Sequence, residues 1–339
     1  SKGRLPQLES VRMRRKAVER GIPLFTSLDT ANALANALTS RYSLGNVELV
    51  DINNMRTKHK KLTFTKMRGT GNDYLYFDCF DQTVESPESL AVRLSNRRSG
   101  VGSDGIVLIM PSTIADAKMR MFNADGTEGS VAGNALRCVC KYLYENGHVR
   151  KDEMAVETGS GVKTAKLFIR EDQVFSVLVD MGCPAFAPAK IPVKLDGDRV
   201  MMRPVFLAGE KREISCVSMG NPHVVIFVED VNRIPLEQVG PQIETDSLFP
   251  ERVNVSFAQI VDKNDIVMRV WERGIGETAA CGTGACAVAV AAVENGFCTR
   301  GADIDVRLPG GTLVVRYQED GKVWLTGDAN TDFTGTIEI

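Results

Sequence analysis

Two turns of small residues decide the fold: Ala132-Gly133-Asn134-Ala135 and Cys281-Gly282-Thr283-Gly284. They stand 149 residues apart, and each introduces a stretch that predicts a helix. Similar turns at this separation indicate an internal duplication.

The same order of predicted elements surrounds both turns. The first half is predicted to contain strands near 62–67 and 73–79, a helix near 88–97, strands near 104–110 and 117–123, a helix from Gly133 to about Glu145, and strands near 153–182. The second half repeats this order, with strands near 213–219 and 223–229, a helix near 235–245, strands near 252–260 and 265–271, a helix from Gly282 to about Asn295, and strands near 302–327. A duplicated α/β architecture explains this pattern most simply.

Two equivalent helices would place two helix N-termini in equivalent positions. If these N-termini face each other, they define a cleft between the halves, which is the candidate site. Their free backbone N–H groups and positive dipole ends would hold a carboxylate or a phosphate.

Cys281 stands immediately before the second helix. A helix N-terminus is expected to lower the pKa of a thiol, so Cys281 is a candidate catalytic thiolate. A small buried core cysteine explains the position equally well, because cysteines are often buried.

Asparagines and one charged pair add candidates of lower specificity. Most asparagines beside Gly or Pro are turn residues, which accounts for Asn72, Asn134 and Asn221 individually. Asn254 interrupts an apolar strand, where its amide needs a partner or a ligand. The pair Glu272-Arg273, taken alone, is typical of a solvated surface.

The composition is that of an ordinary globular protein. The 339 residues include 41 Lys plus Arg and 43 Asp plus Glu, and 43% are hydrophobic. We expect two domains, and we find no apolar run long enough to cross a membrane and no secretory signal, so a cytoplasmic location is expected. The eight cysteines show no CxxC pair or partnered histidines, which argues against zinc and disulfides and predicts no metal site.

Residues 1–61 differ from the rest of the chain in charge. They carry 12 basic and 5 acidic side chains, whereas residues 62–339 carry 29 and 38. The pattern predicts a helix near 7–20, a short strand near 21–26, a helix from about Asp29 to Leu38, and a linker at 53–61. We therefore expect residues 1–61 to be a separate piece, followed by one half at 62–182, joined by the last strand at 328–339, and a second half at 183–327.

Residues 62–339 resemble diaminopimelate epimerases over their whole length. The resemblance rests on ordered blocks of sequence: Phe64 to Tyr74, Gly102-Ser103-Asp104-Gly105, Phe122 to Gly126, Gly133 to Cys138, Gly220-Asn221-Pro222-His223, Arg252-Val253-Asn254, and Glu272 to Gly284. It implies two pseudo-symmetric α/β halves, each a strand-rich shell around a central helix, with the active site in the cleft between them.

The resemblance also implies a reaction and a set of residues. Two cysteines flank the substrate α-carbon; one thiolate removes its proton and the other thiol protonates the opposite face, without a cofactor. The helix N-termini, at Gly133-Asn134 and Gly282-Thr283, would stabilise the developing charge. The implied substrate-binding residues are Asn72, Asn123, Asn221, Asn254, Glu272 and Arg273, with His223 and Glu272 supporting acid–base chemistry beside Cys281.

One position departs from this family pattern. The residue before Gly133 is the first catalytic cysteine in the family, and here it is Ala132. Cys138 lies six residues further along the predicted helix, about 9 Å down the axis and on another face, so it cannot replace that thiol. The same reasoning excludes Cys140, and excludes Cys286 as a replacement for Cys281. The substitution is explained by a deliberate change, by natural loss of activity, or by a family member with different chemistry; the first two are favoured. Gly105 also stands where some members carry a larger polar residue.

Residues 1–56 resemble a different family, the methylglyoxal-synthase-like domain at the end of the carbamoyl phosphate synthetase large chain. The matching residues are Lys2-Gly3-Arg4, Arg12 to Arg15, Ala17-Val18-Glu19 and Gly21 to Ala31. The first strands of that domain have no counterpart here. The basic run is interpreted as a solvated helix face in preference to a phosphate-binding patch, and nothing indicates nucleic-acid binding.

The sequence thus predicts a cofactor-independent epimerase acting on LL-diaminopimelate, impaired at Ala132, whose partners are this small-molecule substrate and a second copy in a homodimer. Two alternatives stay open. One is another cofactor-independent amino-acid racemase of the same fold, and the other is an inactive homologue that binds an amino acid.

Overall fold

The computed structural model describes residues 8–22, 31–32, 35, 61–129 and 132–338. The chain divides into two compact units, Ser1–His59 and Lys60–Ile339. In the first unit, helix α1 spans Leu8–Glu19, which confirms the helix predicted at 7–20. Residues 31, 32 and 35 are helical, whereas most of the predicted strand at 21–26, the rest of the second helix and the linker lie outside the described residues, apart from Lys61.

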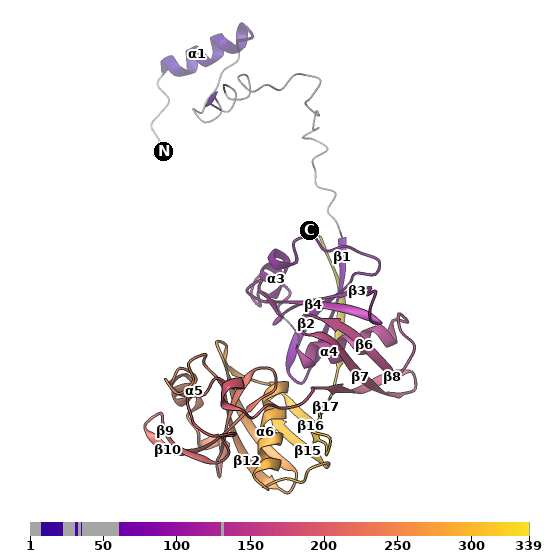
Figure 1. Cartoon of the computed structure of the whole chain (residues 1–339). Helices are drawn as coiled ribbons and strands as arrows, with labels where there is room; N and C mark the ends of the chain where they lie inside the picture. The colour runs from indigo at the N-terminus through magenta and orange to yellow at the C-terminus, as the bar shows by residue number, and fades with distance from the viewer. Residues whose placement is uncertain (1–7, 23–30, 33–34, 36–60, 130–131, 339) are drawn as a thin grey trace. The chain divides into compact units, whose positions relative to one another are not determined.

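The second unit contains one set of elements twice (Figure 1). The first set is β1 (Lys61–Gly69), β2 (Asn72–Asp78), α3 (Pro87–Ser95), β3 (Gly105–Met110), β4 (Ala117–Asn123), β5 (Glu128–Gly129), α4 (Gly133–Glu145), β6 (Glu153–Thr158), β7 (Gly161–Arg170) and β8 (Gln173–Asp180). After a 3₁₀ turn at Pro188–Lys190, the second set begins with β9 (Arg203–Leu207), β10 (Glu210–Ser218), β11 (Pro222–Phe227), a 3₁₀ turn at Val231–Arg233, α5 (Leu236–Glu244), β12 (Asn254–Asp262), β13 (Asp265–Glu272) and β14 (Gly276–Thr278). It continues with α6 (Gly282–Glu294), β15 (Asp303–Leu308), β16 (Gly311–Tyr317) and β17 (Val323–Gly327), and the last strand is β18 (Asn330–Glu338).

The two halves match residue by residue at an offset of 149. Tyr74 pairs with Gly105 in the parallel ladder of β2 and β3, and His223 pairs with Asn254 in that of β11 and β12. Helices α4 and α6 have 13 residues each. Both are followed by Asn-Gly, and Gly147 and Gly296 adopt φ values of +81° and +78°, the left-handed conformation in which glycine commonly ends a helix. The predicted duplication is therefore confirmed.

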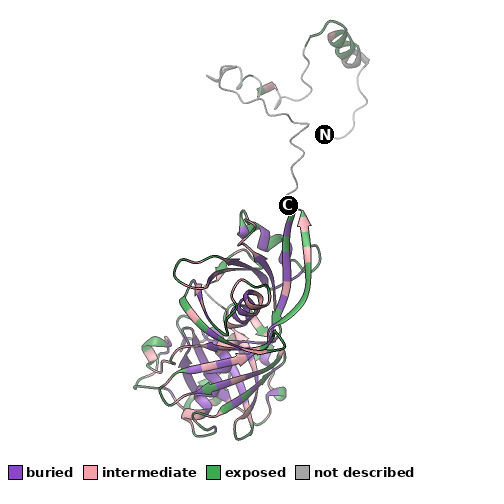
Figure 2. Ribbon diagram, turned by 90° about the vertical axis from the view of Figure 1, so that its right-hand side faces the viewer, coloured by how far each residue is buried: buried purple, intermediate pink, exposed green. Residues whose placement is uncertain are grey.

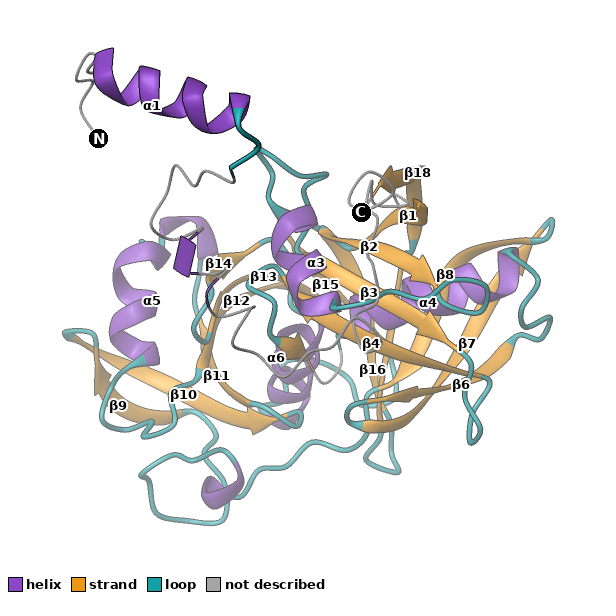
Figure 3. Cartoon of the chain, turned by 90° about the horizontal axis from the view of Figure 1, so that it is seen from above, coloured by secondary structure: helices purple, strands orange, loops and turns teal. Residues whose placement is uncertain are grey.

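Each half packs strands on both sides of its core (Figures 2 and 3). In β2, Tyr74 and Tyr76 pack in the cluster around α4, whereas Leu75 and Phe77 pack in the cluster under α3. This alternation follows from the two-residue period of a strand. In the second half, residues 284–292 of α6 are all buried, as expected for a helix composed almost entirely of Ala, Val and Cys.

Strand pairing also joins the two halves. β17 of the second half pairs antiparallel with β8 of the first, and β18 returns to pair with β1. The turn between β1 and β2 lies against the second half: a Cβ placed on Gly71 would stand 3.1 Å from the Cα of Gly310. Among the described residues, no helix is both long and apolar enough to cross a membrane.

Candidate active site

The N-termini of α4 and α6 begin in the same way. Their N-cap residues, Ala132 and Cys281, have extended backbones, with φ and ψ of −128° and 127° and of −138° and 107°. Their carbonyls accept the first helical hydrogen bonds, from Leu136 and Ala285, both at 2.9 Å. A Cβ placed on Gly282 would stand 3.8 Å from Asn134 Oδ1, so the two helix starts lie next to each other.

A cavity of about 940 Å³ opens at these helix starts and is lined by both halves. The predicted site residues that line it are Asn72, Asn123, Ala132, Gly133, Asn134, Asn221, Glu272, Cys281, Gly282 and Thr283. The structure therefore brings ten predicted residues together. Such a cavity, with unpaired helix N–H groups at its floor, suits an anionic group such as a carboxylate.

Cys281 is buried at the edge of the cavity, with 6% of its surface exposed. Burial raises the pKa of its thiol far above the ordinary value, and the negative charge of Glu272 raises it further. Thr283 Oγ1, at 3.6 Å from the sulfur, and the backbone N–H of Gly284 act in the opposite direction. The expectation that the helix start alone lowers this pKa is therefore wrong, because desolvation outweighs the dipole.

Glu272 is the last residue of β13 and the carboxylate nearest this chemistry. It accepts a 2.5 Å hydrogen bond from Thr278 Oγ1 and also interacts with the Cys281 thiol. Burial raises its pKa, against the lowering effect of these two contacts. A carboxylate with a raised pKa beside a thiol is a suitable acceptor for the thiol proton.

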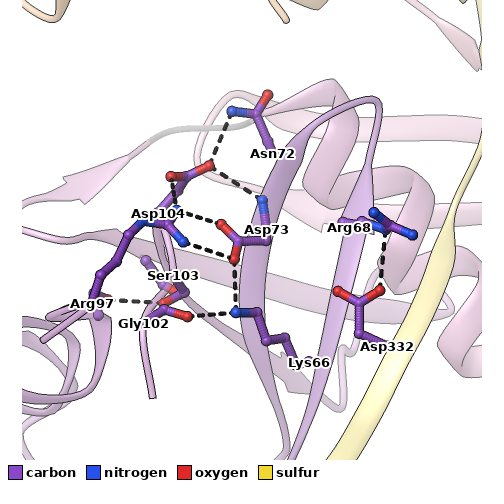
Figure 4. Close-up of polar contacts among 11 residues, drawn as sticks. Lys66, Arg68, Asn72, Asp73, Arg97, Gly102, Ser103, Asp104 and Asp332 are labelled. Atoms are coloured by element: carbon purple, nitrogen blue, oxygen red, sulfur yellow. Dashed lines mark hydrogen bonds and ion pairs between the residues drawn. The ribbon is translucent and has the colours of Figure 1, made fainter. Parts of the chain in front are cut away.

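A charged network supports the first-half wall of the cavity (Figure 4). Asp104 Oδ2 accepts hydrogen bonds from Asn72 Nδ2 at 3.1 Å and from the backbone N–H of Asp73 at 3.2 Å, and Arg97 donates to both carboxylates, at 2.7 Å to Asp73 and 2.8 Å to Asp104. Lys66 Nζ lies 2.8 Å from Asp73. Burial acts to raise the pKa of Asp73, but the hydrogen bonds from Arg97 and Lys66 outweigh it, so this pKa is lowered.

Arg97 and Asp104 also line the cavity, and the sequence analysis missed both as site residues. Asp104 stands within the block Gly102 to Gly105, directly ahead of a buried strand, and that position was the available signal. Arg97 follows an amphipathic helix in which nothing marks it out, because its partners lie 7 and 24 residues away in sequence.

Three predicted residues do not line the cavity as it stands. His223 is fully buried behind Asn221, its Nε2 lies 3.0 Å from Asn221 Oδ1, and burial, with the charge of Arg273, lowers its pKa to about 3. Asn254 donates to the Pro222 carbonyl at 2.8 Å and accepts from the Arg273 N–H at 3.0 Å, so main-chain groups satisfy its amide. Arg273 is exposed and donates to the Glu251 carbonyl at 3.0 Å.

The other cysteines offer no second base. Cys138, Cys140 and Cys286 are fully buried in the helix cores, as predicted, and burial raises the pKa of Cys138 to about 11 and that of Cys286 to about 12. All eight cysteines are free thiols. Among the residues that the structure describes, no three His, Cys, Asp or Glu side chains gather as metal ligands would.

Comparisons with known proteins agree on the family. The sequence model described as diaminopimelate epimerase matches residues 64–187 and 215–331. The diaminopimelate epimerase of Acetivibrio thermocellus is 48% identical over 279 residues, covering 82% of this chain and 99% of the relative. That of Desulfovibrio desulfuricans is 50% identical over 285 residues, with the same coverage.

Solved structures extend the likeness in fold. A PhzF-family phenazine biosynthesis protein from Bacillus anthracis superposes with a TM-score of 0.61 at 18% identity, covering 83% of this chain and all of the other. A probable proline racemase from Agrobacterium radiobacter K84 superposes with a TM-score of 0.56 at 15% identity, covering 82% of this chain and 93% of the other. At these identities, the likeness concerns the fold alone.

Proposed function

The chain belongs to the diaminopimelate epimerase family, and from this premise we propose that it is a cofactor-independent isomerase that inverts LL-diaminopimelate to the meso isomer, in lysine and peptidoglycan biosynthesis. The observation that carries the proposal is the pair of equivalent helix N-termini that line one cavity, with Cys281 at one of them. Inversion at a carbon requires a proton acceptor on one face and a proton donor on the other. The two N-cap positions, 132 and 281, are where this fold places such groups.

The roles follow from the contacts. Cys281 transfers its thiol proton to Glu272, and the thiolate then accepts the substrate α-proton; Thr283 and Gly284 stabilise that thiolate by hydrogen bonding. The backbone N–H groups at Gly133-Asn134 and Gly282-Thr283 hold the carboxylate of the reacting carbon as negative charge develops on it. Asn72, Asn123, Asn221 and Glu272 line the same cavity and bind the polar groups of the substrate.

Three further predicted roles rest on the family resemblance. Arg273 and Asn254 bind the distal amino-acid group, and His223 acts through Asn221, to which it is hydrogen bonded. His223 is neutral near pH 7, because its pKa is lowered to about 3, so it serves as an N–H donor.

Ala132 removes one of the two proton-transfer groups. Its methyl side chain can neither donate nor accept a proton, so the chain as it stands is impaired in inversion. A binding protein for the same amino acid is the second candidate function, and Ala132 is the observation that favours it.

A substrate panel tests the substrate assignment. The Ala132→Cys variant is incubated separately with LL-diaminopimelate, lysine and proline, and loss of optical rotation or formation of the second isomer is followed. Inversion of diaminopimelate alone supports the proposal. Inversion of a single-headed amino acid in preference would favour a different racemase of this fold.

The N-terminal unit and the assembly belong to the same proposal. We keep the assignment of residues 1–56 to a methylglyoxal-synthase-like remnant, for which α1 supplies a matching helix. The division into halves at 62–182 with 328–339 and at 183–327, a homodimer and a cytoplasmic location are proposed on the family resemblance.

A further inference from the structure

Two equivalent chains of hydrogen bonds end at the two helix N-termini. In each half, an asparagine just before or at the start of a strand contacts the second residue of the central helix. Asn134 Nδ2 donates to Asn72 Oδ1 at 2.6 Å, and Asn221 Nδ2 donates to Thr283 Oγ1 at 3.2 Å. We call the set Asp104, Asn72 and Asn134 the first relay, and the set His223, Asn221 and Thr283 the second relay.

The second relay ends in a donor. The amide of Asn221 gives its N–H to Thr283, so its oxygen faces His223 and accepts the Nε2–H at 3.0 Å. Because Thr283 Oγ1 accepts from Asn221, its own proton is free to point to the sulfur of Cys281, 3.6 Å away. A donor at this sulfur stabilises the thiolate.

The first relay has the opposite polarity. Asp104 as a carboxylate can only accept hydrogen bonds, so it fixes the amide of Asn72 with its N–H toward Asp104 and its oxygen toward Asn134. Asn134 therefore donates to Asn72, and its Oδ1, which is buried, has no partner. The first relay ends in a free acceptor beside the cavity.

Asp104 has no counterpart in the second half. The position 149 residues later is Val253, which is fully buried in an apolar cluster. Asp104 is held by Arg97 and by the backbone N–H of Asp73, and Asp73 is held in turn by Arg97 and Lys66 (Figure 4). The first half thus invests a network of charges in one amide orientation.

A second difference between the halves acts in the same direction. Asn123 and Glu272 are equivalent, since each ends its strand one residue after the paired positions Phe122–Ile106 and Trp271–Val255. Glu272 can accept the proton of a thiol at position 281. Asn123, whose amide donates to Thr127 at 2.9 Å, cannot accept a proton from position 132.

We propose that Asp104 is a positioning residue that makes position 132 the proton-donating side of the site, and that Cys281 is the proton-accepting side. The inference rests on the proposed function. In the complete reaction, the Cys281 thiolate takes the α-proton and becomes a thiol, while a thiol at position 132 gives its proton to the opposite face and becomes a thiolate. The acceptor Asn134 Oδ1 favours the thiol at position 132, and the donor Thr283 favours the thiolate at Cys281.

The test measures how readily a thiol at position 132 ionises. The full-length Ala132→Cys and Ala132→Cys/Asp104→Asn variants are alkylated with iodoacetamide between pH 6.5 and 9.5, and the rate at each cysteine is read by peptide mass spectrometry. An amide at position 104 can donate as well as accept, so Asn72 and Asn134 can turn over and present an N–H to the new thiol. We expect alkylation at position 132 to accelerate about tenfold at pH 7.5, with Cys281 changed less than about twofold.

Matched variants separate polarity from charge and from folding. Asp125 also lines the cavity, and its carboxylate accepts only from Thr127 among the described hydrogen bonds, so Asp125→Asn in the Ala132→Cys background is expected to leave position 132 within about twofold. Asn134→Thr in the same background copies Thr283 and is expected to accelerate alkylation like Asp104→Asn, which keeps the test valid if that variant fails to fold.

An unchanged rate at position 132 in Asp104→Asn and Asn134→Thr, or an equal acceleration in Asp125→Asn, would overturn the inference. The assay needs no substrate. A failure to invert diaminopimelate would therefore count against the proposed function and leave the alkylation result interpretable.

Discussion

Thr283 Oγ1 lies 3.6 Å from the sulfur of Cys281, and it accepts a hydrogen bond from Asn221 at 3.2 Å. The hydroxyl is therefore oriented to donate to the sulfur, which lowers the pKa of Cys281 against the larger effect of burial. This contact links the second half of the fold directly to the reactive atom.

Replacing Thr283 by valine removes that donor while keeping the branched shape. We expect the pKa of Cys281 to rise and its alkylation by iodoacetamide at pH 8 to slow by about three- to tenfold. Thr283→Ser keeps the hydroxyl and should keep the wild-type rate. Equal slowing in both variants would show that packing, and not the hydrogen bond, is responsible.

Replacing Glu272 by glutamine should have opposite effects on reactivity and on catalysis. The negative charge of Glu272 raises the pKa of Cys281, so its removal should accelerate alkylation of Cys281 several-fold. The same variant should lose α-proton exchange, because the acceptor for the thiol proton is gone. Glu277→Gln is the control, since Glu277 pairs with Arg269 at 2.8 Å; if it matched Glu272→Gln, the effect would be one of general charge.

His223 should make stability depend on pH. Its pKa is lowered to about 3 in the folded protein, so between pH 6.5 and 3 the unfolded state binds a proton that the folded state does not. Its contribution to the free energy of unfolding should therefore fall by up to about 1.4 kcal/mol per pH unit as the pH drops below 6.5.

Urea unfolding at pH 7.0, 6.0 and 5.0 measures this slope. His223→Gln should flatten it, whereas His148→Gln, which removes an imidazole paired with Asp78 at 2.7 Å, should keep the part caused by His223. A slope that is the same in His223→Gln and in the parent would contradict the assignment.

Gly71 should be the more sensitive of two turn glycines. It has φ +89°, and a Cβ there would meet the Cα of Gly310, whereas Gly161, with φ +93°, has nothing within 4 Å. Gly161→Ala should cost about 1 kcal/mol from its backbone conformation, and Gly71→Ala about 1–3 kcal/mol more, because backbone must move. Chemical denaturation of both variants measures the difference, and equal costs would mean that the close approach of the halves carries no strain.

The sequence allowed the framework to be predicted because duplication is a local, repeated signal. The 149-residue spacing placed Ala132 and Cys281 at equivalent helix starts, and both are the N-cap residues of 13-residue helices. Asn254 was also expected to need a partner, and it found two in the main chain, at Pro222 and Arg273. The identity of such partners depends on strand pairing and loop geometry, which a single sequence does not reveal.

Burial explains what could not be predicted at Cys281. A helix start is visible in the sequence, but the desolvation that raises the pKa of Cys281 comes from residues throughout the second half. The position of Asp104 was similarly hidden, because its contacts with Asn72 and Asp73 cross 32 and 31 residues of chain.

The most direct measurement follows LL-diaminopimelate in deuterated water by NMR, with this chain and with its Ala132→Cys variant. The account predicts α-deuterium without inversion, or no reaction, in the chain as it stands, and α-deuterium together with the meso isomer in the variant. Meso product formed equally by both chains, or by neither, would contradict the claim that this is an epimerase site lacking one of its two proton-transfer groups.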